Sequence, residues 1–522
     1  MDRAFPVVVI GAGLSGLTAA LHLAARGVAP LVLEADTEFP GGRLAGGAAD
    51  IFTFNGKLWS FDGQHGIHAL WGGYDNMRAM LDRFIGIDLI PSEGEEWINR
   101  WRNQVRAIEA GTAVRNTWLP APMHYLQLLL RPRFWGTITP LDFLSLPGML
   151  VSLIWAMGLD PIDEQIDLDG LMIDEFFRGW TPNLRAIFTG LAHSMLAAPS
   201  EAITLTGFIA AMRFYTFNRR DGWRLDFLPS NPHDCLITPM MRRIEEFGGE
   251  VAGGMRALEL RHDAAGWEIL VEDAAHNITR SVRAEHVILA VQAPAAERLL
   301  KNSPATPEAA EMRFPRGLRN AAVRLWFDAE PRRGVPAGMF TGDFAVDNFF
   351  WLHRMQDEFK VWHEQTGGSA IEVHLYAPES ILDRGDNVLL IETLKEVQVA
   401  FPTLRGHFVH GVVRHNSATQ TAFLVPTARS LHVETPWPNF FACGDWIGYP
   451  SPAFWMERCT VTGIAAANHV LASLNEFPLY DLIPPRKPEA LARMLGIIVK
   501  WGRGILGPVI FATVRALQRF RE

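Results

Sequence analysis

The sequence predicts an α/β protein in which a Rossmann-like nucleotide-binding domain is assembled from distant parts of the chain. A strand–glycine–helix motif opens the sequence at residues 7–26, and a second strand followed by a Gly-Asp pair and a helix lies near the other end, at 439–457. Alternating apolar runs at 255–261 and 267–272 indicate hairpin strands between them. Because both ends resemble parts of one dinucleotide site, we expect an α+β substrate domain to be inserted between them.

The opening strand is predicted at 7–10, where four apolar residues suit a strand buried on both faces. Three glycines follow, and each relaxes a steric limit. They permit a tight turn, a close backbone approach to a pyrophosphate, and close packing of the next helix on the strand. These glycines are Gly11, Gly13 and Gly16.

The first helix is predicted over 14–26, with Gly27 ending it. Its first residues, Leu14 and Ser15, carry backbone amides that would hold negative phosphates, and the helix dipole favours the same charge. A strand, helix and second strand in this order are the context that the glycine motif requires.

The second strand, predicted at 30–34, ends in a carboxylate. We expect Glu34, with the adjacent Ala35, to contact the adenosine ribose, and Glu34 would repel the 2′-phosphate of NADP. Gly42 would let the backbone pass the phosphates, and Arg43 can form a charge-assisted bond to them. These residues favour FAD as the cofactor over NAD.

The far half of the site follows a strand predicted at 439–443. Gly444 and Asp445 end this strand, and Asp445 can hydrogen-bond the ribitol or phosphate-linked groups of FAD. Met456 and Glu457 then open a helix, whose N-terminal amides would stabilise negative charge on a reduced flavin.

Composition limits the partners of the chain. A net charge of −9 over 522 residues gives no sign of nucleic-acid binding. Three cysteines without a CxxC pair, and a nucleotide motif that begins at residue 7, favour a reduced, cytoplasmic protein without a signal peptide. His65 and His68 are three residues apart, but no third ligand accompanies them, so we expect no metal site.

The interleaved pattern predicts discontinuous domains. Helical periodicity appears at 75–84 and 184–195, and further strands are expected at 286–291, 322–327 and 370–376. The FAD domain is predicted at 1–65, 225–299 and 430–480, the substrate domain at 66–224 and 300–429, and an amphipathic tail at 481–522.

Several features favour contact with apolar material. The chain has 32 Phe and 17 Trp but only 6 Tyr, which suits a protein that encloses an apolar ligand. The uncharged stretch 143–159 is at the short limit for a membrane span and is interrupted by Pro147 and Gly148, which favours a buried or membrane-dipping helix. The tail is basic and amphipathic, with Trp501, and indicates a membrane-surface helix or, alternatively, a helix docked on the protein itself.

At these motifs the chain resembles the FAD-dependent amine oxidase/phytoene desaturase superfamily, up to about residue 480. Two segments look most like its carotenoid branch, which includes ζ-carotene desaturase, ring-aromatising desaturase/methyltransferases and hydroxysqualene dehydroxylases: 62–68 (DGQHGIH) and 454–463 (FWMERCTVTG). Asp62 directly precedes Gly63, unlike the dehydroxylase pattern, and Arg458 stands where amine oxidases usually have glycine.

The resemblance implies a fold of the glutathione reductase/amine oxidase type and an apolar isoprenoid substrate reached from the membrane. It also implies cofactor contacts at Gly63 and Gln64 and a backbone contact to adenine near Ala257. It leaves the electron acceptor open. The expected location is the cytoplasmic face of the membrane, with peripheral attachment.

Flavin N5 would accept a hydride while a neighbouring carbon loses a proton. His65 is the candidate proton acceptor, with a structural role as the alternative. Trp446 and Trp455, with Phe454, could stabilise a carbocation through their ring faces. Glu457 is a further catalytic candidate, although capping of its own helix is the favoured interpretation.

Two rival functions remain. The first is a hydroxysqualene dehydroxylase-like or amine-oxidising flavoenzyme, for which an acidic cluster at Asp167, Asp169, Asp174 and Glu175 offers a polar rim. The second is a flavin-free prenyl-chain carrier on the same scaffold. The intact nucleotide motif argues against the carrier.

Overall fold

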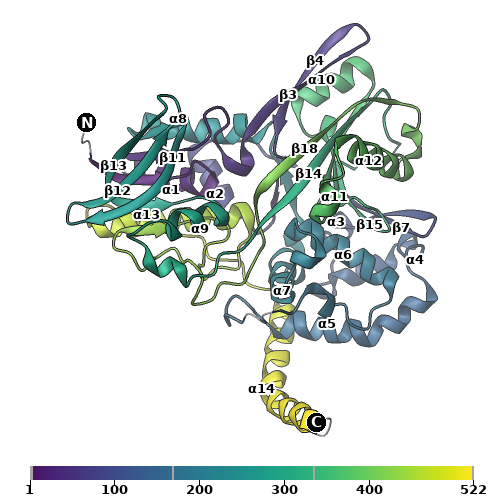
Figure 1. The fold of residues 1–522 in the computed structure, drawn as a ribbon. Coiled ribbons are helices and arrows are strands. Elements are labelled where there is room, and N and C mark those ends of the chain that lie inside the picture. The colour runs from purple at the N-terminus through teal and green to yellow at the C-terminus, as the bar shows by residue number, and fades with distance from the viewer. Residues whose placement is uncertain (1–3, 167, 169, 333–334, 520–522) are drawn as a thin grey trace.

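Two seven-stranded sheets organise the computed structural model of the protein, which describes residues 4–166, 168, 170–332 and 335–519 (Figure 1). The first sheet and its helices lie to the left in Figure 1, the second lies to the right, and a helical region lies below the second. Asp167 and Asp169 of the predicted acidic cluster and residues 520–522 of the tail fall outside the described residues.

The first sheet joins three remote parts of the chain in the order β10-β2-β1-β13-β12-β11, with β19 paired to β13. The pairs β1–β2, β1–β13, β2–β10 and β13–β19 are parallel, whereas β11–β12–β13 is an antiparallel meander. The strands are β1 (Ala4–Ile10), β2 (Pro30–Leu33), β10 (Glu250–Ala252), β11 (Met255–Asp263), β12 (Gly266–Asp273), β13 (Ile278–Leu289) and β19 (Phe440–Ala442). The Rossmann-like prediction is confirmed.

Helices cover this sheet and bring the two ends of the chain together. The first and last of them pack on each other at Gly463, and a Cβ on Gly16 would clash with the Gly11 carbonyl, so the predicted close packing of helix on strand is present. These helices are α1 (Leu14–Ala24), α2 (Asp75–Phe84), α8 (Thr238–Glu246), α9 (Ala293–Lys301) and α13 (Trp455–Leu474).

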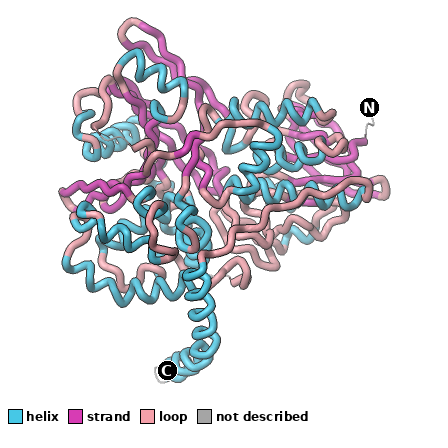
Figure 2. The backbone as a smooth tube through the Cα atoms, turned by 180° about the vertical axis from the view of Figure 1, so that it is seen from behind, coloured by secondary structure: helices cyan, strands magenta, loops and turns pink. Residues whose placement is uncertain are grey.

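The second sheet has the order β18-β14-β17-β16-β15-β7-β8, and its long central strands are buried on both faces. Helices α10 (Asp357–Thr366), α11 (Glu379–Leu382) and α12 (Asp386–Ala400) accompany it. Its strands are β7 (Glu95–Trp101), β8 (Gln104–Glu109), β14 (Gly317–Phe327), β15 (Ala337–Gly342), β16 (Asn348–Trp351), β17 (Ser369–Leu375) and β18 (Phe408–Thr421). Figure 2 shows these strands from behind.

A hairpin of β3 (Gly46–Phe54) and β4 (Lys57–Gln64) packs against the second sheet. The ring of Phe52 meets those of Trp326 and Trp362 at centroid distances of 5.3 and 5.7 Å. The sequence predicted this segment as part of the FAD domain, but its apolar face is buried by the substrate sheet. A third, small sheet has the strand order β5-β9-β6 and consists of β5 (Ala69–Trp71), β6 (Ile90–Pro91) and β9 (Leu225–Phe227).

The remaining helices form a region rich in exposed apolar side chains. It contains α3 (Gly111–Arg115), α4 (Pro132–Trp135), α5 (Leu146–Gly158), α6 (Pro182–Leu196) and α7 (Leu205–Met212), and the long α14 (Ala490–Arg519) leaves the body beside it. The helical segment Pro140–Gly158 is long and apolar enough to cross a membrane by length and composition, and 33% of it is buried in the protein. Among the described residues no other helix meets that test.

Candidate active site

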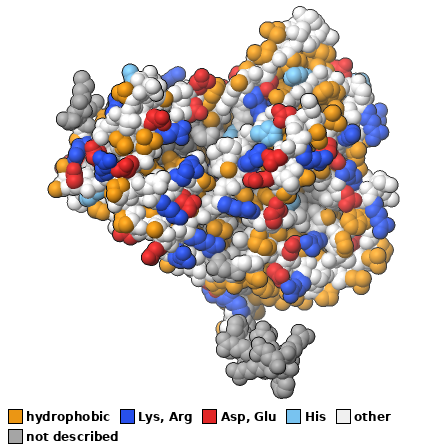
Figure 3. All heavy atoms as spheres, viewed as in Figure 1, with side chains coloured by type: hydrophobic (Ala, Val, Ile, Leu, Met, Phe, Trp, Pro, Cys, Tyr) orange, Lys and Arg blue, Asp and Glu red, His pale blue; other side chains and the backbone are white. Residues whose placement is uncertain are grey.

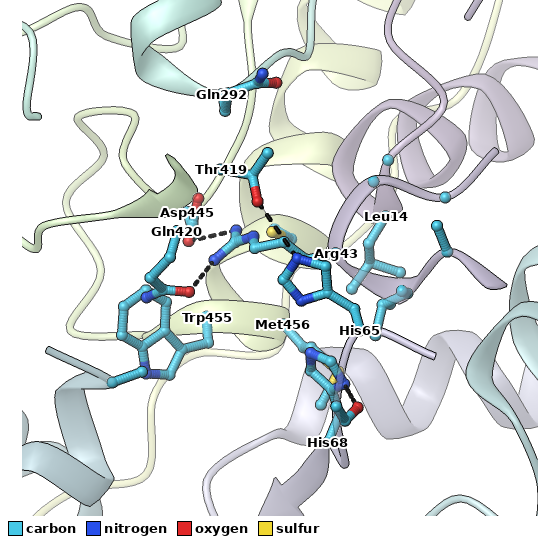
Figure 4. A pocket seen from close by; sticks show the side chains of 18 of the residues that line it. Leu14, Arg43, His65, His68, Gln292, Thr419, Gln420, Asp445, Trp455 and Met456 are labelled. Carbon is cyan, nitrogen blue, oxygen red and sulfur yellow. Dashed lines mark hydrogen bonds and ion pairs between the residues drawn. The ribbon is translucent and has the colours of Figure 1, made fainter. Parts of the chain in front are cut away.

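One cavity of about 1120 Å³ extends between the two sheets (Figure 4). It exceeds the roughly 300–1,000 Å³ of ordinary small-molecule sites, as a dinucleotide together with a substrate requires. Most predicted site residues line it, from both ends of the chain. They are Gly11, Gly13, Leu14, Ser15, Glu34, Ala35, Gly42, Arg43, His65, Ala257, Gly444, Asp445, Trp446, Trp455 and Met456.

The end of the cavity at β1 and α1 fits the phosphates of FAD. A Cβ on Gly13 would meet no atom within 4 Å, so this glycine leaves open space where a pyrophosphate can approach. Gly13 is also the N-cap of α1, and it offers no side chain to bond the first helical amides. Those amides are therefore available to an anion.

The carboxylate at the end of β2 is fixed by the backbone around it. One oxygen of Glu34 accepts the N–H of Ala12 at 2.8 Å and the other accepts the N–H of Asp36 at 2.9 Å. Each carboxylate oxygen can accept a further bond, so Glu34 is oriented and retains capacity for ribose hydroxyls at the cavity wall.

Arg43 links the two halves of the site. Its guanidinium forms an ion pair with Asp445 at 2.6 Å and donates to the side-chain oxygen of Gln420 at 3.0 Å (Figure 4). The Nε2 of Gln420 is buried without a partner in the described structure, although Gln420 lines the cavity. An unpaired buried donor beside a cation fits the polar groups of a bound FAD.

Two of the histidines that line the cavity, His65 and His68, are neutral. The Nε2 of His65 lies 3.4 Å from the hydroxyl of Thr419, and the Nδ1 of His68 lies 2.7 Å from the carbonyl of Gly66. Burial, with the charges of nearby groups that include Arg43, lowers the pKa of His65 to about 3 and that of His68 to about 4. His65 is thus a weak proton acceptor. The described residues contain no group of three His, Cys, Asp or Glu side chains arranged to hold a metal.

Four of the predicted residues lie outside the cavity lining: Gly16, Gly63, Gln64 and Glu457. Gly63 allows β3 and β4 to approach closely, since a Cβ there would clash with the hairpin backbone at Gly47 and Ala48, and the side chain of Gln64 bonds that of Gln356 at 3.2 Å. Neither lines the cavity, because the hairpin turns toward the second sheet. Gly63 and Gln64 therefore do not face the cavity, and Gly16, whose missing Cβ allows close packing of α1, lies outside its lining as well.

Glu457 is the fourth predicted residue outside the cavity lining. Its carboxylate accepts the backbone N–H groups of Asn76 and Met77 and the side-chain amide of Asn76, each at 2.9 Å. It caps the N-terminus of α2, neither reacting in the cavity nor capping its own helix. The free amides of a helix N-terminus are strong partners for a carboxylate.

The predicted aromatic residues are held by their polar edges. The indole N–H of Trp446 donates to the carbonyl of Val291 at 3.0 Å, and that of Trp455 donates to the carbonyl of Met195 at 2.9 Å. Both line the cavity, whereas Phe454 packs against Phe423 in a tilted arrangement with a centroid distance of 4.2 Å, outside the lining.

The substrate side of the cavity holds residues that the sequence interpretation missed. Glu372 and His374 alternate in β17 and Tyr376 follows directly after its end; His374 and Tyr376 line the cavity. Polar residues spaced by two in an otherwise apolar strand were a usable signal. The apolar walls come from separate elements, and no local pattern unites them: Trp71, Trp97, Leu191, Trp223, Leu225, Met339 and Phe350.

Comparison with known proteins agrees with this geometry. A sequence profile described as flavin containing amine oxidoreductase matches residues 14–471. The chain is 25% identical over 480 residues to the carotenoid phi-ring synthase of Streptomyces griseus, covering 89% of this chain and 87% of the relative. It is 22% identical over 409 residues to the 15-cis-phytoene desaturase of Solanum lycopersicum, covering 76% of this chain and 64% of the relative.

Among solved structures, cyclohexylamine oxidase from Brevibacterium oxydans superposes with a TM-score of 0.65 at 14% identity, covering 91% of this chain and all of that one. This likeness supports the fold. The matched segment spans both halves of the cavity that fits FAD. The chain therefore belongs to the flavin containing amine oxidoreductase family and is an FAD-dependent oxidoreductase.

Proposed function

We propose that the protein oxidises an apolar isoprenoid of the carotenoid type, by desaturation or by ring modification. Bound FAD supplies hydride acceptance, which is chemistry of the cofactor itself. The protein residues contribute an apolar chamber, an orientation for the substrate and a path for the proton that the substrate loses.

The apolar substrate side of the cavity carries this proposal. Aromatic rings from four separate segments line it, including Trp71, Trp97, Trp223 and Phe350. The only described carboxylate on this side, Glu95, is paired with Arg115 at 3.0 Å. A polyene gains about 25 cal/mol per Å² of apolar surface that such walls bury. The names of the two carotenoid-related relatives point the same way.

The rival functions have less support. The case for amine oxidation rests on solved structures that resemble this chain in fold alone. The described members of the acidic cluster, Asp174 and Glu175, pair with Arg185 and Arg178 and do not line the cavity. A hydroxysqualene dehydroxylase-like reaction would use the same apolar chamber. The flavin-free carrier conflicts with the family of the chain.

Anaerobic mixing of the purified holoenzyme with candidate substrates tests the proposal. We expect a carotenoid polyene to bleach the flavin absorbance and an alkylamine to leave it unchanged. A third mixture contains a squalene derivative, and bleaching by this compound but not by the polyene would favour the hydroxysqualene dehydroxylase-like reaction. Bleaching by the amine, with no response to any isoprenoid, would overturn the proposed substrate class.

We also propose that the protein attaches peripherally to the cytoplasmic face of the membrane. Large apolar side chains of the helical region are exposed, among them Leu144 at 70%, Leu150 at 58% and Trp501 at 71%. Figure 3 displays hydrophobic side chains along the lower edge of the body, in the region of α5. Such a surface would lie in the membrane interface and give a lipid-dissolved substrate a short route to the protein.

The first half of α14 belongs to this surface. Val499 packs against Gly158 at the end of α5, and Lys500 pairs with Glu164 at 3.3 Å. The two interpretations of the tail are therefore compatible, because a helix docked at its beginning can still contribute to a shared apolar face.

Flotation with vesicles that contain anionic lipid tests the attachment. The double variant Leu150→Asp/Ile154→Asp changes exposed positions on one face of α5, and each lost apolar contact is worth about 1.5–3 kcal/mol. We expect flotation to fall more than tenfold. The control Val361→Asp/Val388→Asp changes exposed positions on α10 and α12. Equal flotation of both variants would refute the assigned surface.

A further inference from the structure

We propose that Tyr376, His374 and Glu372 form a proton relay that accepts the proton lost by the substrate. This inference rests on the proposed function and adds to it the chain's own acid–base machinery. Glu372 and His374 occupy alternate positions near the end of β17, and Tyr376 follows directly after its last residue at the same spacing, so the three side chains lie side by side.

The hydrogen bonds give the relay a direction. The Nε2 of His374 lies 2.9 Å from Oε1 of Glu372, and the Nδ1 lies 2.9 Å from the hydroxyl of Tyr376. A carboxylate only accepts, so Nε2 carries the hydrogen and Nδ1 is the free acceptor of the neutral ring. Tyr376 therefore donates its O–H to His374. Tyr376 and His374 line the cavity, and Glu372 lies fully buried behind them.

Glu372 is held as a carboxylate. Arg324 donates to its second oxygen at 2.8 Å, and the N–H of Ile67 donates to the first at 2.7 Å. Burial opposes ionisation, but Arg324 and His374 outweigh it and keep the pKa of Glu372 well below its ordinary value. A permanently charged carboxylate orients the imidazole and stabilises it once it is protonated.

A second carboxylate balances the charge behind the relay. Arg324 also lies 3.3 Å from Asp50, and Asp50 pairs with Arg414. The buried Arg324 and the half-buried Arg414 thus face two buried carboxylates before the reaction. Asp347 accepts the backbone N–H of Tyr376 at 2.7 Å, which fixes the end of the strand that carries the phenol.

The substrate loses a hydride to the flavin and a proton from the neighbouring carbon, and the electrons of that second C–H bond become the new C=C bond. The proton passes to the oxygen of Tyr376 as the hydrogen of that phenol passes to Nδ1 of His374. The imidazolium then holds the proton against Glu372 until product leaves and water enters.

Other bases on the cavity wall suit this role less well. His65 and His68 have pKa values lowered to about 3 and about 4 by burial and nearby charges, and Glu95 is paired with Arg115. Burial raises the pKa of Tyr376, so this residue stays a neutral phenol and acts as a conduit. The imidazole behind it is the group that stores the proton.

The experiment compares Tyr376→Phe with the wild type in anaerobic stopped-flow mixing with the polyene, in H₂O and in D₂O. We expect bleaching to slow by about 10²-fold or more, as loss of general base catalysis predicts. We also expect the solvent isotope effect of the wild type to disappear, with FAD content and polyene affinity retained. His374→Gln, a second variant, should lose the isotope effect as well.

Tyr480→Phe is the matched control. The Tyr480 hydroxyl donates to the His22 carbonyl at a distance of 2.9 Å, and Tyr480 does not line the cavity. Its bleaching rate and isotope effect should equal those of the wild type. Bleaching of Tyr376→Phe within threefold of wild type, or with its isotope effect intact, would overturn the relay while leaving the proposed function standing. A wild-type flavin that no polyene bleaches would instead remove the proposed function and the relay with it.

Discussion

At the scale of single residues, buried charged groups in this protein find partners far away in the sequence. Arg43 pairs with Asp445, and Arg324 pairs with Glu372. A buried charge without a partner is strongly unfavourable, so each of these residues depends on a contact that the local sequence does not reveal. Arg43 and Asp445 could be predicted as site residues from their motifs, but their ion pair could not.

The capping of α2 by Glu457 can be tested by a substitution. In Glu457→Gln, an amide NH₂ would replace one of the oxygens that accept the N–H groups of Asn76 and Met77. A donor would then face a donor in a buried position, so we expect the free energy of unfolding to fall by about 1–3 kcal/mol. Urea unfolding of this variant and of the wild type measures the change in the free energy of unfolding.

The control for that experiment is Glu476→Gln, which makes the same chemical change at an exposed position. Equal midpoints for the two variants would contradict the capping role of Glu457.

At the scale of elements, the two halves of the site meet where α1 crosses α13. Both helices begin at the cavity, so their packing positions the residues that face FAD. The glycine motif predicted α1, and helical periodicity predicted 75–84, which is the observed extent of α2. The hairpin β3–β4 falls within residues 1–65, which the sequence predicts as FAD domain, yet it packs on the second sheet, because no local pattern indicates which sheet buries an apolar face.

The packing of α13 on α1 can be tested by a substitution at Gly463. A Cβ at this position would lie 2.7 Å from the carbonyl oxygen of Ser15 and 3.0 Å from Cβ of Thr18. Gly463→Ala must therefore push α13 away from α1, with an expected loss of about 1–3 kcal/mol in the free energy of unfolding. Because the N-terminus of α1 moves with it, FAD retained after gel filtration should fall as well.

Gly502→Ala is the matched helical control, since a Cβ there meets no atom within 4 Å. That variant should be unchanged or more stable by up to about 1 kcal/mol. If the Gly463→Ala protein were as stable as this control, the close packing of α13 on α1 at this position would be contradicted.

At the scale of the whole molecule, buried neutral histidines make stability depend on pH. Burial is the largest cause that lowers the pKa of His22, His124 and His353 to about 4, and it also lowers the pKa values of His65 and His68. Between about pH 4 and the ordinary value near 6.5 the unfolded chain binds more protons than the folded one. Stability is therefore present above that range and is lost as the pH falls.

We expect the urea midpoint to drop between about pH 7 and about pH 5. Glu358 and Glu457 oppose this trend, because burial raises the pKa of each to about 7, but the histidines outnumber them. His22→Gln should flatten the dependence, whereas His276→Gln, at an exposed position, should not. A midpoint that stays constant over this range in the wild type would contradict the expectation.

The sequence by itself determined the fold class, the cofactor and most of the residues at the FAD end of the cavity. Glycine, carboxylate and helix-start signals are local, and each follows from the conformation or charge of a few neighbouring residues. The tertiary structure alone decided the use of Glu457 as a cap, the side on which the hairpin packs, and the alignment of Tyr376, His374 and Glu372 at the substrate cavity. These outcomes depend on which surfaces are buried together, and burial is set by the whole chain.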